Sequence, residues 1–473
     1  MPTAASSTSP PPTRALHPVV VGRAVVDVVH LLRFRASPVR RRSAFGWMLA
    51  GFAVLTVAAA TLPGRLDHAG YGDGRPMDVR LLLPSGFACF LMLAVMSAVA
   101  SGGGRELLAR EHAVIHPLSP TTDALGALLL APLNIAWLIQ AWLLLGCTAY
   151  ALGPDHLWTA QAGVGLWLLA ATALGQVVAW SVEAVRRRRH GLALVRVLGV
   201  GLAAGAVVLQ ASGGLGPVLD HLPTVWLVAG VAQGSSWRWL LTAGVELALL
   251  VAAVVLGAFP AHVAARRTPR DELRLESGAH PARGLPGSAL AGLLRTDRAS
   301  VWRAVPMRRG LAILAVGPGV VALAGDLPWH AMTVLPGLVA SGGALLFGVN
   351  AWCLDGRGGL WRESLPVAPG KVFAARAIVL TEFLLAASAV TIGLASLRAG
   401  VPTASELSAL VACWVVVLVQ VVGAALRWSG RRPFAVDLRS ARATPAPPLM
   451  MVGYSAMTNA SFYDLHHPWF ESA

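Results

Sequence analysis

Charged side chains are scarce in this sequence. Asp, Glu, Lys and Arg make up 13% of its 473 residues, and Lys371 is the only lysine. Hydrophobic residues make up 56%, and the mean hydropathy is +0.64. A soluble domain carries about 25% charged residues. The composition therefore excludes an ordinary soluble domain and predicts an all-α protein that crosses a membrane many times.

Cysteine is scarce as well, and no nucleotide-binding loop is present. The four cysteines lie in apolar runs and outside metal-ligand spacing: Cys89, Cys147, Cys353 and Cys413. This argues against a disulfide framework and a zinc site. A Walker A loop needs Ser or Thr after Gly-Lys, but Gly370-Lys371 is followed by Val372. The chain is therefore expected to hold no cofactor of its own.

About ten apolar runs approach the ~20 residues that a bilayer crossing requires. They are 44–62, 81–100, 124–145, 163–182, 192–211, 240–259, 310–325, 332–353, 374–394 and 407–426. An amphipathic helix is predicted at 19–33, with its apolar face formed by Val21, Val25, Val28 and Leu32. We expect this helix to lie on the membrane surface, and short re-entrant or interfacial helices at 213–237, where Gly and Pro interrupt the apolar pattern.

Arginine is distributed unevenly among the loops. The formal net charge is +15, but the basic residues lie in short loops rather than on one face, which argues against a nucleic-acid partner. Loops at 186–189, 266–309 and 427–442 hold the excess, whereas Asp residues occupy the loops that alternate with them. The positive-inside rule then places both termini in the cytosol. Abundant Ala, Gly, Val and Arg indicate a GC-rich bacterial genome, hence a bacterial plasma membrane.

Three sequence patterns occur twice and in the same order. They are RASPVRR at 35–41 and RAVPMRR at 303–309, an Arg-Glu pair followed by Pro-x-small-Pro at 110–120 and 362–369, and Trp-Ser followed by arginines at 180–181 and 428–429. Such an ordered set is hard to obtain by chance, so the sequence predicts two similar halves. Because both halves begin on the predicted cytosolic side, the repeat is parallel.

This order of parts resembles the permease of type 2 ABC exporters. An interfacial helix, two spans, a charged cytosolic segment, three spans, an outside re-entrant segment and a sixth span match the first half over nearly its whole length. The resemblance implies coupling helices at 105–116 and 357–363, and connecting helices at 19–33 and 293–305. It also implies a separate ABC ATPase subunit, which binds ATP and magnesium and docks on the coupling helices.

The second half is shorter than the first. The predicted organisation is a cytosolic tail at 1–18, a first half at 19–260 with about six spans, a linker and connecting helix at 261–309, a second half at 310–442 with about four spans, and a tail at 443–473. The partners of the fifth and sixth spans are missing. We therefore expect the tail not to cross the membrane and the apolar flank of the second half to be less covered.

Two sets of residues are candidate functional sites. The first, for coupling to the ATPase, comprises Arg105, Glu106, Arg110, Glu111, Arg357, Arg362 and Glu363. The alternative to a docking surface is a solvated turn held by i,i+4 ion pairs. The second, for lining a membrane path, comprises Asn134, Gln140, Glu246, Asn350 and Glu382. The alternative to path lining is that these side chains form hydrogen bonds between helices. His112 and His116 lack a third ligand, so no metal site is predicted.

The prediction is an ATP-driven export permease that is not itself an enzyme. Its partners are the lipid bilayer and an ATPase subunit, and the assembly is a homo- or hetero-oligomer. The rival is a secondary transporter or a membrane-embedded enzyme that works without an ATPase. The absence of paired acids and of His-Asp-Ser sets within the predicted spans favours the permease. The substrate and the direction of transport are left open.

Overall fold

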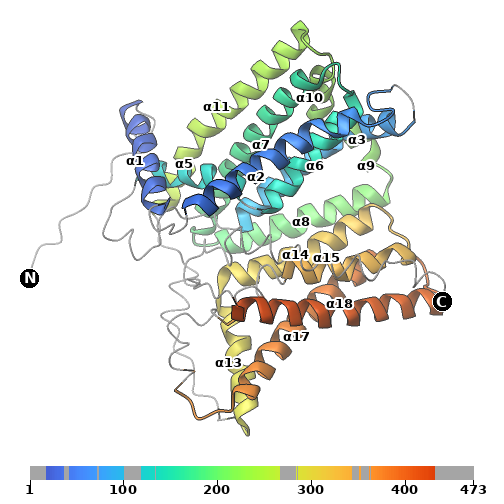
Figure 1. Ribbon diagram of the computed structural model, residues 1–473. Helices are drawn as coiled ribbons and strands as arrows, with labels where there is room; N and C mark the ends of the chain where they lie inside the picture. Colours follow the sequence, from blue (N-terminus) through green and yellow to red (C-terminus); the bar gives the residue numbers. More distant parts are fainter. Residues whose placement is uncertain are drawn as a thin grey trace, which may run out of the picture. The chain divides into compact units, whose positions relative to one another are not determined.

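The computed structural model describes residues 18–36, 42–71, 74–100, 119–133, 135–266, 284, 286–343, 351–352, 362 and 364–431. Over this part of the chain the secondary structure is helical and contains no strand, which confirms the predicted all-α class (Figure 1). The chain divides into two compact units. Unit 1 comprises Met1–Val197 and Gly214–Thr268, and unit 2 comprises Leu198–Gly213 and Pro269–Ala473.

Unit 1 is a bundle of long helices with shorter ones between them. It contains α1 Pro18–Ala36, α2 Arg42–Thr61, η2 Pro63–Arg65, α3 Gly74–Ala100, α5 Pro120–Leu130, η3 Ala131–Leu133, α6 Ile135–Leu152, α7 Leu157–Arg186, α9 Leu215–Asp220, α10 Pro223–Val231 and α11 Trp237–Ala265. The helix α8, Gly191–Ala211, follows α7 and is divided between the units. Helix α5 begins at a serine cap followed by proline, because Ser119 accepts a hydrogen bond from the Thr122 amide.

Helix α7 is the centre of unit 1 and packs against α3, α6 and α11. The Phe87 ring of α3 stacks on Trp167 of α7 with ring centroids 5.7 Å apart, and the Trp167 indole donates to the Phe87 carbonyl at 3.2 Å. Further along both helices, Gly175 lies against the backbone of Ala94. Since the contacts advance together in the two sequences, α3 and α7 are parallel.

Helix α6 runs against the direction of α7. The Trp137 indole, near the start of α6, donates to the Thr172 hydroxyl at 2.8 Å. Gln161, near the start of α7, donates to the Leu145 carbonyl at 3.0 Å. An early residue of each helix therefore meets a later residue of the other. This antiparallel pair, with α3 parallel to α7, is the arrangement expected of successive spans that alternate in direction.

Helix α11 is parallel to α7, as expected for two spans separated by one crossing. Trp239 donates to the Thr159 carbonyl at 2.9 Å near the start of both helices, and Arg187 donates to the Ala264 carbonyl at 2.6 Å near their ends. The chain must therefore return between the end of α7 and the start of α11. The 21 residues of α8 cover ~31 Å as a helix, enough for that return. The short helices α9 and α10 occupy the segment in which Gly and Pro predicted short helices.

Unit 2 repeats the alternation of long helices. It contains α13 Ala289–Arg303, α14 Val305–Ala324, η4 Trp329–Thr333, α15 Val334–Gly343, α17 Pro369–Ala395 and α18 Ala404–Arg431. Helices α14 and α15 both pack on α17, and α15 also packs on α18. The core near η4 contains Met332, Leu335, Ala395 and Leu410.

Contacts within unit 2 give the helix directions. The Thr391 hydroxyl of α17 donates to the Ala315 carbonyl of α14 at 2.8 Å, and Gly319, one turn further along α14, lies against Leu394. Helices α14 and α17 are therefore parallel. Cys413 near the start of α18 donates to the Thr333 carbonyl just before α15, at 3.3 Å, so these two elements meet at their N-terminal ends.

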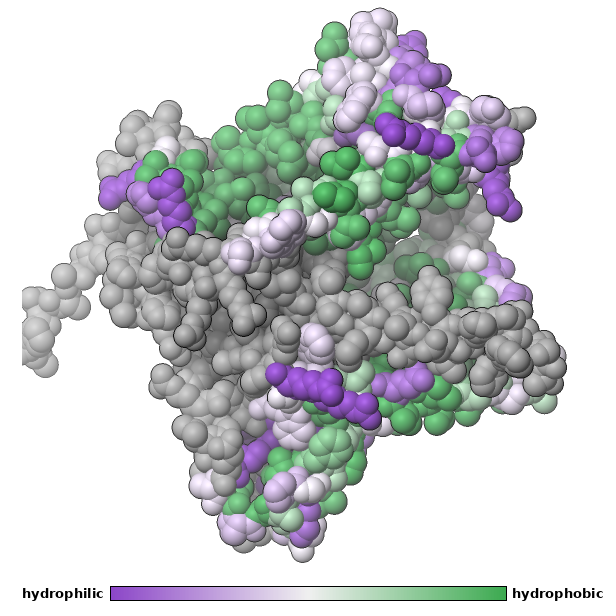
Figure 2. Space-filling model, viewed as in Figure 1, coloured by the Kyte–Doolittle hydropathy of each residue, from purple (hydrophilic) through white to green (hydrophobic). Residues whose placement is uncertain are grey.

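Several helices are long and apolar enough to cross a membrane, as a membrane protein requires. Five pass by length and composition within the described residues: Gly74–Val99, Leu157–Arg186, Trp237–Ala265, Pro369–Ala395 and Ala404–Arg431. A sixth is added if α13 and α14, bent by 81°, form one span, and three shorter apolar helices lie at Leu49–Arg65, Trp137–Leu152 and Gly191–Ala206. Figure 2 shows an apolar surface along α11 and α2. The count of about ten crossings stays a prediction.

The third apolar run is a broken helix rather than the continuous span that hydropathy predicts. Helix α5 ends at Leu130, the 3-10 turn η3 covers Ala131–Leu133, and α6 begins at Ile135. Pro132 explains the break, because proline has no amide hydrogen and its ring clashes with the carbonyl four residues earlier. The run is helical on both sides of this turn, so its assignment as membrane-embedded is compatible with the structure.

Helix α1 buries a face that differs slightly from the predicted one. Ala24 and Val28 are buried, and Val28 packs with Leu130 and the partly buried Leu32. Val25, assigned to the apolar face by spacing, is 50% exposed. The helix is therefore rotated from the predicted orientation, with Ala24 and Val28 rather than Val25 buried. This leaves apolar side chains on its exposed side, as expected of a helix at a membrane surface.

Candidate functional site

Four of the predicted site residues lie in the part of the chain that the structure describes: Gln140, Glu246, Arg362 and Glu382. The others lie outside it: Arg105, Glu106, Arg110, Glu111, Asn134, Asn350, Arg357 and Glu363. The first predicted coupling helix therefore stays a prediction. The second can be followed only through Arg362 and the residues after Glu363.

A buried ionic cluster joins Arg362 to α13 and α17. Asp297 of α13 is 1% exposed, on the same helix face as Leu293 and Val301. Its carboxylate accepts a hydrogen bond from the Arg362 guanidinium and lies 3.5 Å from that of Arg376 on α17. The Arg362 side chain is 11% exposed. One carboxylate thus ties the predicted coupling segment, the predicted connecting helix and a spanning helix together.

A second ion pair joins α13 to α17. The Arg298 guanidinium donates to both oxygens of Glu382, at 2.8 Å from Nε and 2.5 Å from Nη2. This bidentate geometry is the strongest that a guanidinium and a carboxylate form. The hydrogen bond to Glu382 and the negative charge of its carboxylate raise the pKa of Arg298 above its usual value. Next to this pair, the Trp302 ring meets Phe383 edge-on at 5.8 Å.

A groove of about 390 Å³ lies beside the ionic cluster. It is lined by α13, by the residues before it and by the chain after Glu363: Gly284, Pro286, Ala289, Gly292, Leu293, Arg295, Thr296, Arg362, Leu365 and Val367. Its walls are mainly apolar, with Arg295 and Arg362 as its charged residues. The Arg295 guanidinium donates to the Gly284 carbonyl at 2.8 Å, and this acceptor is neutral.

The structure gives Arg362 and Glu382 partners that sequence reasoning did not supply. Arg362, predicted to face an ATPase, is held by Asp297, and Glu382, predicted to line a path, is held by Arg298. Asp297 and Arg376 were not among the predicted site residues. One pattern pointed to Asp297: it is the single acid in a helix that also carries three arginines, so it was a candidate for a buried partner.

Glu246 lies inside unit 1 without a hydrogen-bond partner among the described residues. Its side chain is 0% exposed, and neither carboxylate oxygen forms a hydrogen bond. It shares the buried face of α11 with Thr242 and Ala253, the face that packs against neighbouring helices. Gln140 on α6 is half-buried. The two predicted path residues therefore differ, because only Glu246 is sealed within the bundle.

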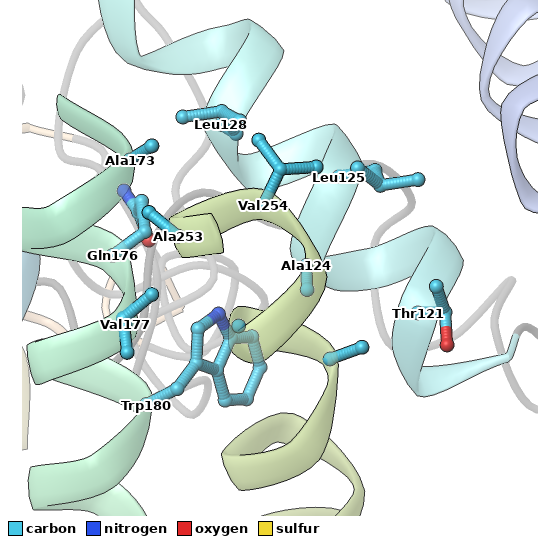
Figure 3. A pocket seen from close by; sticks show the side chains of 12 residues that line it. Thr121, Ala124, Leu125, Leu128, Ala173, Gln176, Val177, Trp180, Ala253 and Val254 are labelled. Carbon is cyan, nitrogen blue, oxygen red and sulfur yellow. The ribbon is translucent and has the colours of Figure 1, made fainter. Parts of the chain in front are cut away.

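A small cavity separates α5, α7 and α11, with a volume of about 20 Å³ (Figure 3). Gln176 and Trp180 from α7 and Ala253 from α11 line it, and the Gln176 amide oxygen is buried without a hydrogen bond. At its edge, the Thr121 hydroxyl and the His262 imidazole hydrogen-bond at 3.0 Å and link α5 to α11. The volume suffices for about one water molecule, but not for a transported substrate.

Among the residues described, no group of three His, Cys, Asp or Glu side chains could hold a metal ion. His112 and His116 lie outside this part of the chain. Comparisons with protein-family models, with curated proteins and with solved structures find no match to this chain. The assignment of function therefore depends on the helices and on the ionic cluster themselves.

Proposed function

We propose that the chain is the permease subunit of an ATP-driven exporter in a bacterial plasma membrane. It crosses the membrane about ten times in two parallel halves, and a separate ATPase docks on its cytosolic coupling segments. One observation carries the proposal: the two units, described independently, have corresponding helix contacts.

The correspondence follows the sequence repeat. If α2, α3, α6 and α7 match α14, α15, α17 and α18 in that order, four contacts have a counterpart. In unit 1, α6 packs on α2, α3 and α7, and α3 packs on α7; in unit 2, α17 packs on α14, α15 and α18, and α15 packs on α18. The parallel pair α14 and α17 has its counterpart in α2 and α6. The Trp142 indole donates to the Thr56 hydroxyl, and Gly146, one turn further along α6, lies against the Ala59 carbonyl, so α2 and α6 are parallel too.

The amphipathic helices correspond too. Helix α1 precedes the first span of its half and packs on α5, and α13 precedes α14 and packs on α17. Each therefore contacts the segment that follows a predicted coupling helix. In unit 2 this contact is the ionic cluster of Asp297. A movement imposed on Arg362 by a docked partner would be transmitted through Asp297 to α13 and to Arg376 on α17.

The experiment is purification of the affinity-tagged chain from its native membranes. We expect a second chain with a Walker A loop to copurify, and ATP hydrolysis by the complex to drive transport in vesicles. The double variant Glu111→Lys, Glu363→Lys should insert normally and lose the ATPase. Asp220→Lys, in the exposed turn that ends α9 on the predicted outer side, is the matched control and should retain it. Normal ATPase binding by the double variant would contradict the coupling assignment.

One observation favours the alternative of an ATPase-independent secondary transporter, namely the buried carboxylate of Glu246. Acids inside spans are common in proton relays of transporters. The same vesicles separate the two functions. Transport that requires a proton gradient, and proceeds without an ATPase or ATP, would establish the alternative and exclude the permease of an ATP-driven exporter.

A further inference from the structure

Glu246 is the most unusual side chain in the described part of unit 1. It is completely buried, it lies in the first half of the apolar helix α11, and neither of its oxygens has a hydrogen-bond partner among the described residues. An ionised carboxylate in such a place loses its hydration without any compensation. A neutral carboxylic acid loses much less. The geometry therefore favours the protonated form of this side chain.

Among the residues that the structure describes, no charged group lies near enough to stabilise a carboxylate at this position. Helix α11 packs against α5, α7 and α10. Helix α10 carries no titratable residue, and α7 carries none before Glu183. The Thr121–His262 hydrogen bond places the start of α5 at the far end of α11, ~24 Å along the helix from Glu246. The titratable residues that these elements hold are Asp123, Glu183 and Arg186, with Arg238 and His262 on α11 itself.

The surroundings of Glu246 leave little space for water. One turn earlier on α11, Thr242 is 1% exposed, and a Cβ built on Gly230 of α10 would lie 1.9 Å from its hydroxyl. A Cβ built on Gly163 of α7 would lie 2.6 Å from Val231 of α10. The three helices are therefore in close contact beside the acid. A charged Glu246 could be hydrated only if α10 or α7 moved away from α11.

We propose that Glu246 is a proton-binding site, and that release of its proton opens the contact of α11 with α10 and α7. The carboxylic acid holds the helices closed, and the carboxylate draws water between them. The proton leaves the carboxyl oxygen for a water molecule, and no other group is oxidised or reduced. This goes beyond the proposed function, because the site acts in the chain alone and requires neither ATP nor a partner.

The test uses the full chain in vesicles of phosphatidylcholine and phosphatidylglycerol, without nucleotide. Infrared difference spectra between the natural chain and Glu246→Gln should contain, at neutral pH, the carbonyl band of a protonated carboxyl group. In the natural chain this band should disappear as the pH is raised. Glu406→Gln, at the exposed start of α18, is the control and should leave the band in place. Absence of the band at neutral pH would overturn the proposal.

Hydrogen exchange supplies a second measurement that separates a switch from a passive buried acid. Amide exchange in α10 and in the first half of α11, measured relative to the intrinsic base-catalysed exchange rate at each pH, should rise several-fold at the pH at which the band disappears. It should stay unchanged over that range in Glu246→Gln, whose amide cannot ionise. Exchange that rises equally in both proteins would overturn the proposed opening. Because no ATPase is present, neither result depends on whether the chain is an ABC permease.

Discussion

Asp297 holds together α13, the segment at Arg362 and α17, and the last two lie more than 60 residues after it in the sequence. Its carboxylate, 1% exposed, pairs with Arg362 and Arg376, whose side chains are 11% and 5% exposed. Buried ion pairs add little stability relative to apolar residues, but removal of one partner leaves a buried charge and is costly. Asp297 therefore fixes the position of the two arginines more than it adds to stability.

Asp297→Asn is expected to lower the free energy of unfolding by about 3 kcal/mol, because two largely buried guanidinium groups lose their carboxylate. Thermal or denaturant unfolding of the purified chain, followed by tryptophan fluorescence, measures the loss. Arg295→Gln on the same helix is the control. That side chain is exposed, and its hydrogen bond within the described residues is to the Gly284 carbonyl, so its loss should stay within about 1 kcal/mol. Equal effects of the two changes would contradict a special role for Asp297.

The helices could be predicted from the sequence because membrane spans are continuous in the chain. The predicted apolar runs fall on helices where the structure describes them, although the run at 332–353 is described as helix only as far as Gly343, and the broken segment before α11 forms α9 and α10. Contacts between distant residues could not be predicted in this way. The Asp297–Arg362 pair and the burial of Glu246 depend on how helices pack, which hydropathy does not record. Pro132 is a local sequence signal for the break after α5, but a prediction from hydropathy alone does not take proline into account.

Replacement by alanine should have opposite effects on stability at two glycines of α7. A Cβ on Gly175 would lie 3.1 to 3.2 Å from the backbone of Ala94 and Val95, which cannot move without shifting α3. Gly165 has nothing within 4 Å of its Cβ position. Gly175→Ala should therefore destabilise the chain by about 1–3 kcal/mol. Gly165→Ala should stabilise it by up to about 1 kcal/mol, because alanine loses less entropy in a helix.

The same unfolding assay compares the two glycine variants. The pair is matched, because the residue change, the helix and the intrinsic helix propensity are identical. Only the distance to α3 differs. If Gly175→Ala were as stable as Gly165→Ala, the close packing of α3 on α7 described here would be wrong.

The second unit leaves more of its last helix uncovered than the first unit leaves of the corresponding one. In the apolar window of α7, 61% of residues are buried, whereas 39% are buried in that of α18. Helix α11 covers α7, whereas the structure describes no residue after Arg431, the last residue of α18. The expectation that the partners of the fifth and sixth spans are missing stays a prediction. The tail at 443–473 lies outside the described residues, so its failure to cross the membrane stays a prediction.

The proposed parallel repeat makes a prediction for the molecule as a whole, because it requires both halves to face the same way. Asp155 and Val401 lie just before the N-terminal ends of α7 and α18. Arg189 follows the C-terminal end of α7, and Lys371 lies at the N-terminal end of α17. All four are exposed.

In a chain without its natural cysteines, Asp155→Cys and Val401→Cys should react with an impermeant thiol reagent added to intact cells. Arg189→Cys and Lys371→Cys should react only after the membrane is opened. This follows because arginine-rich loops stay in the cytosol. If Asp155→Cys and Lys371→Cys reacted from the same side, the two halves would be inverted, and the common orientation on which a shared ATPase side depends would be excluded.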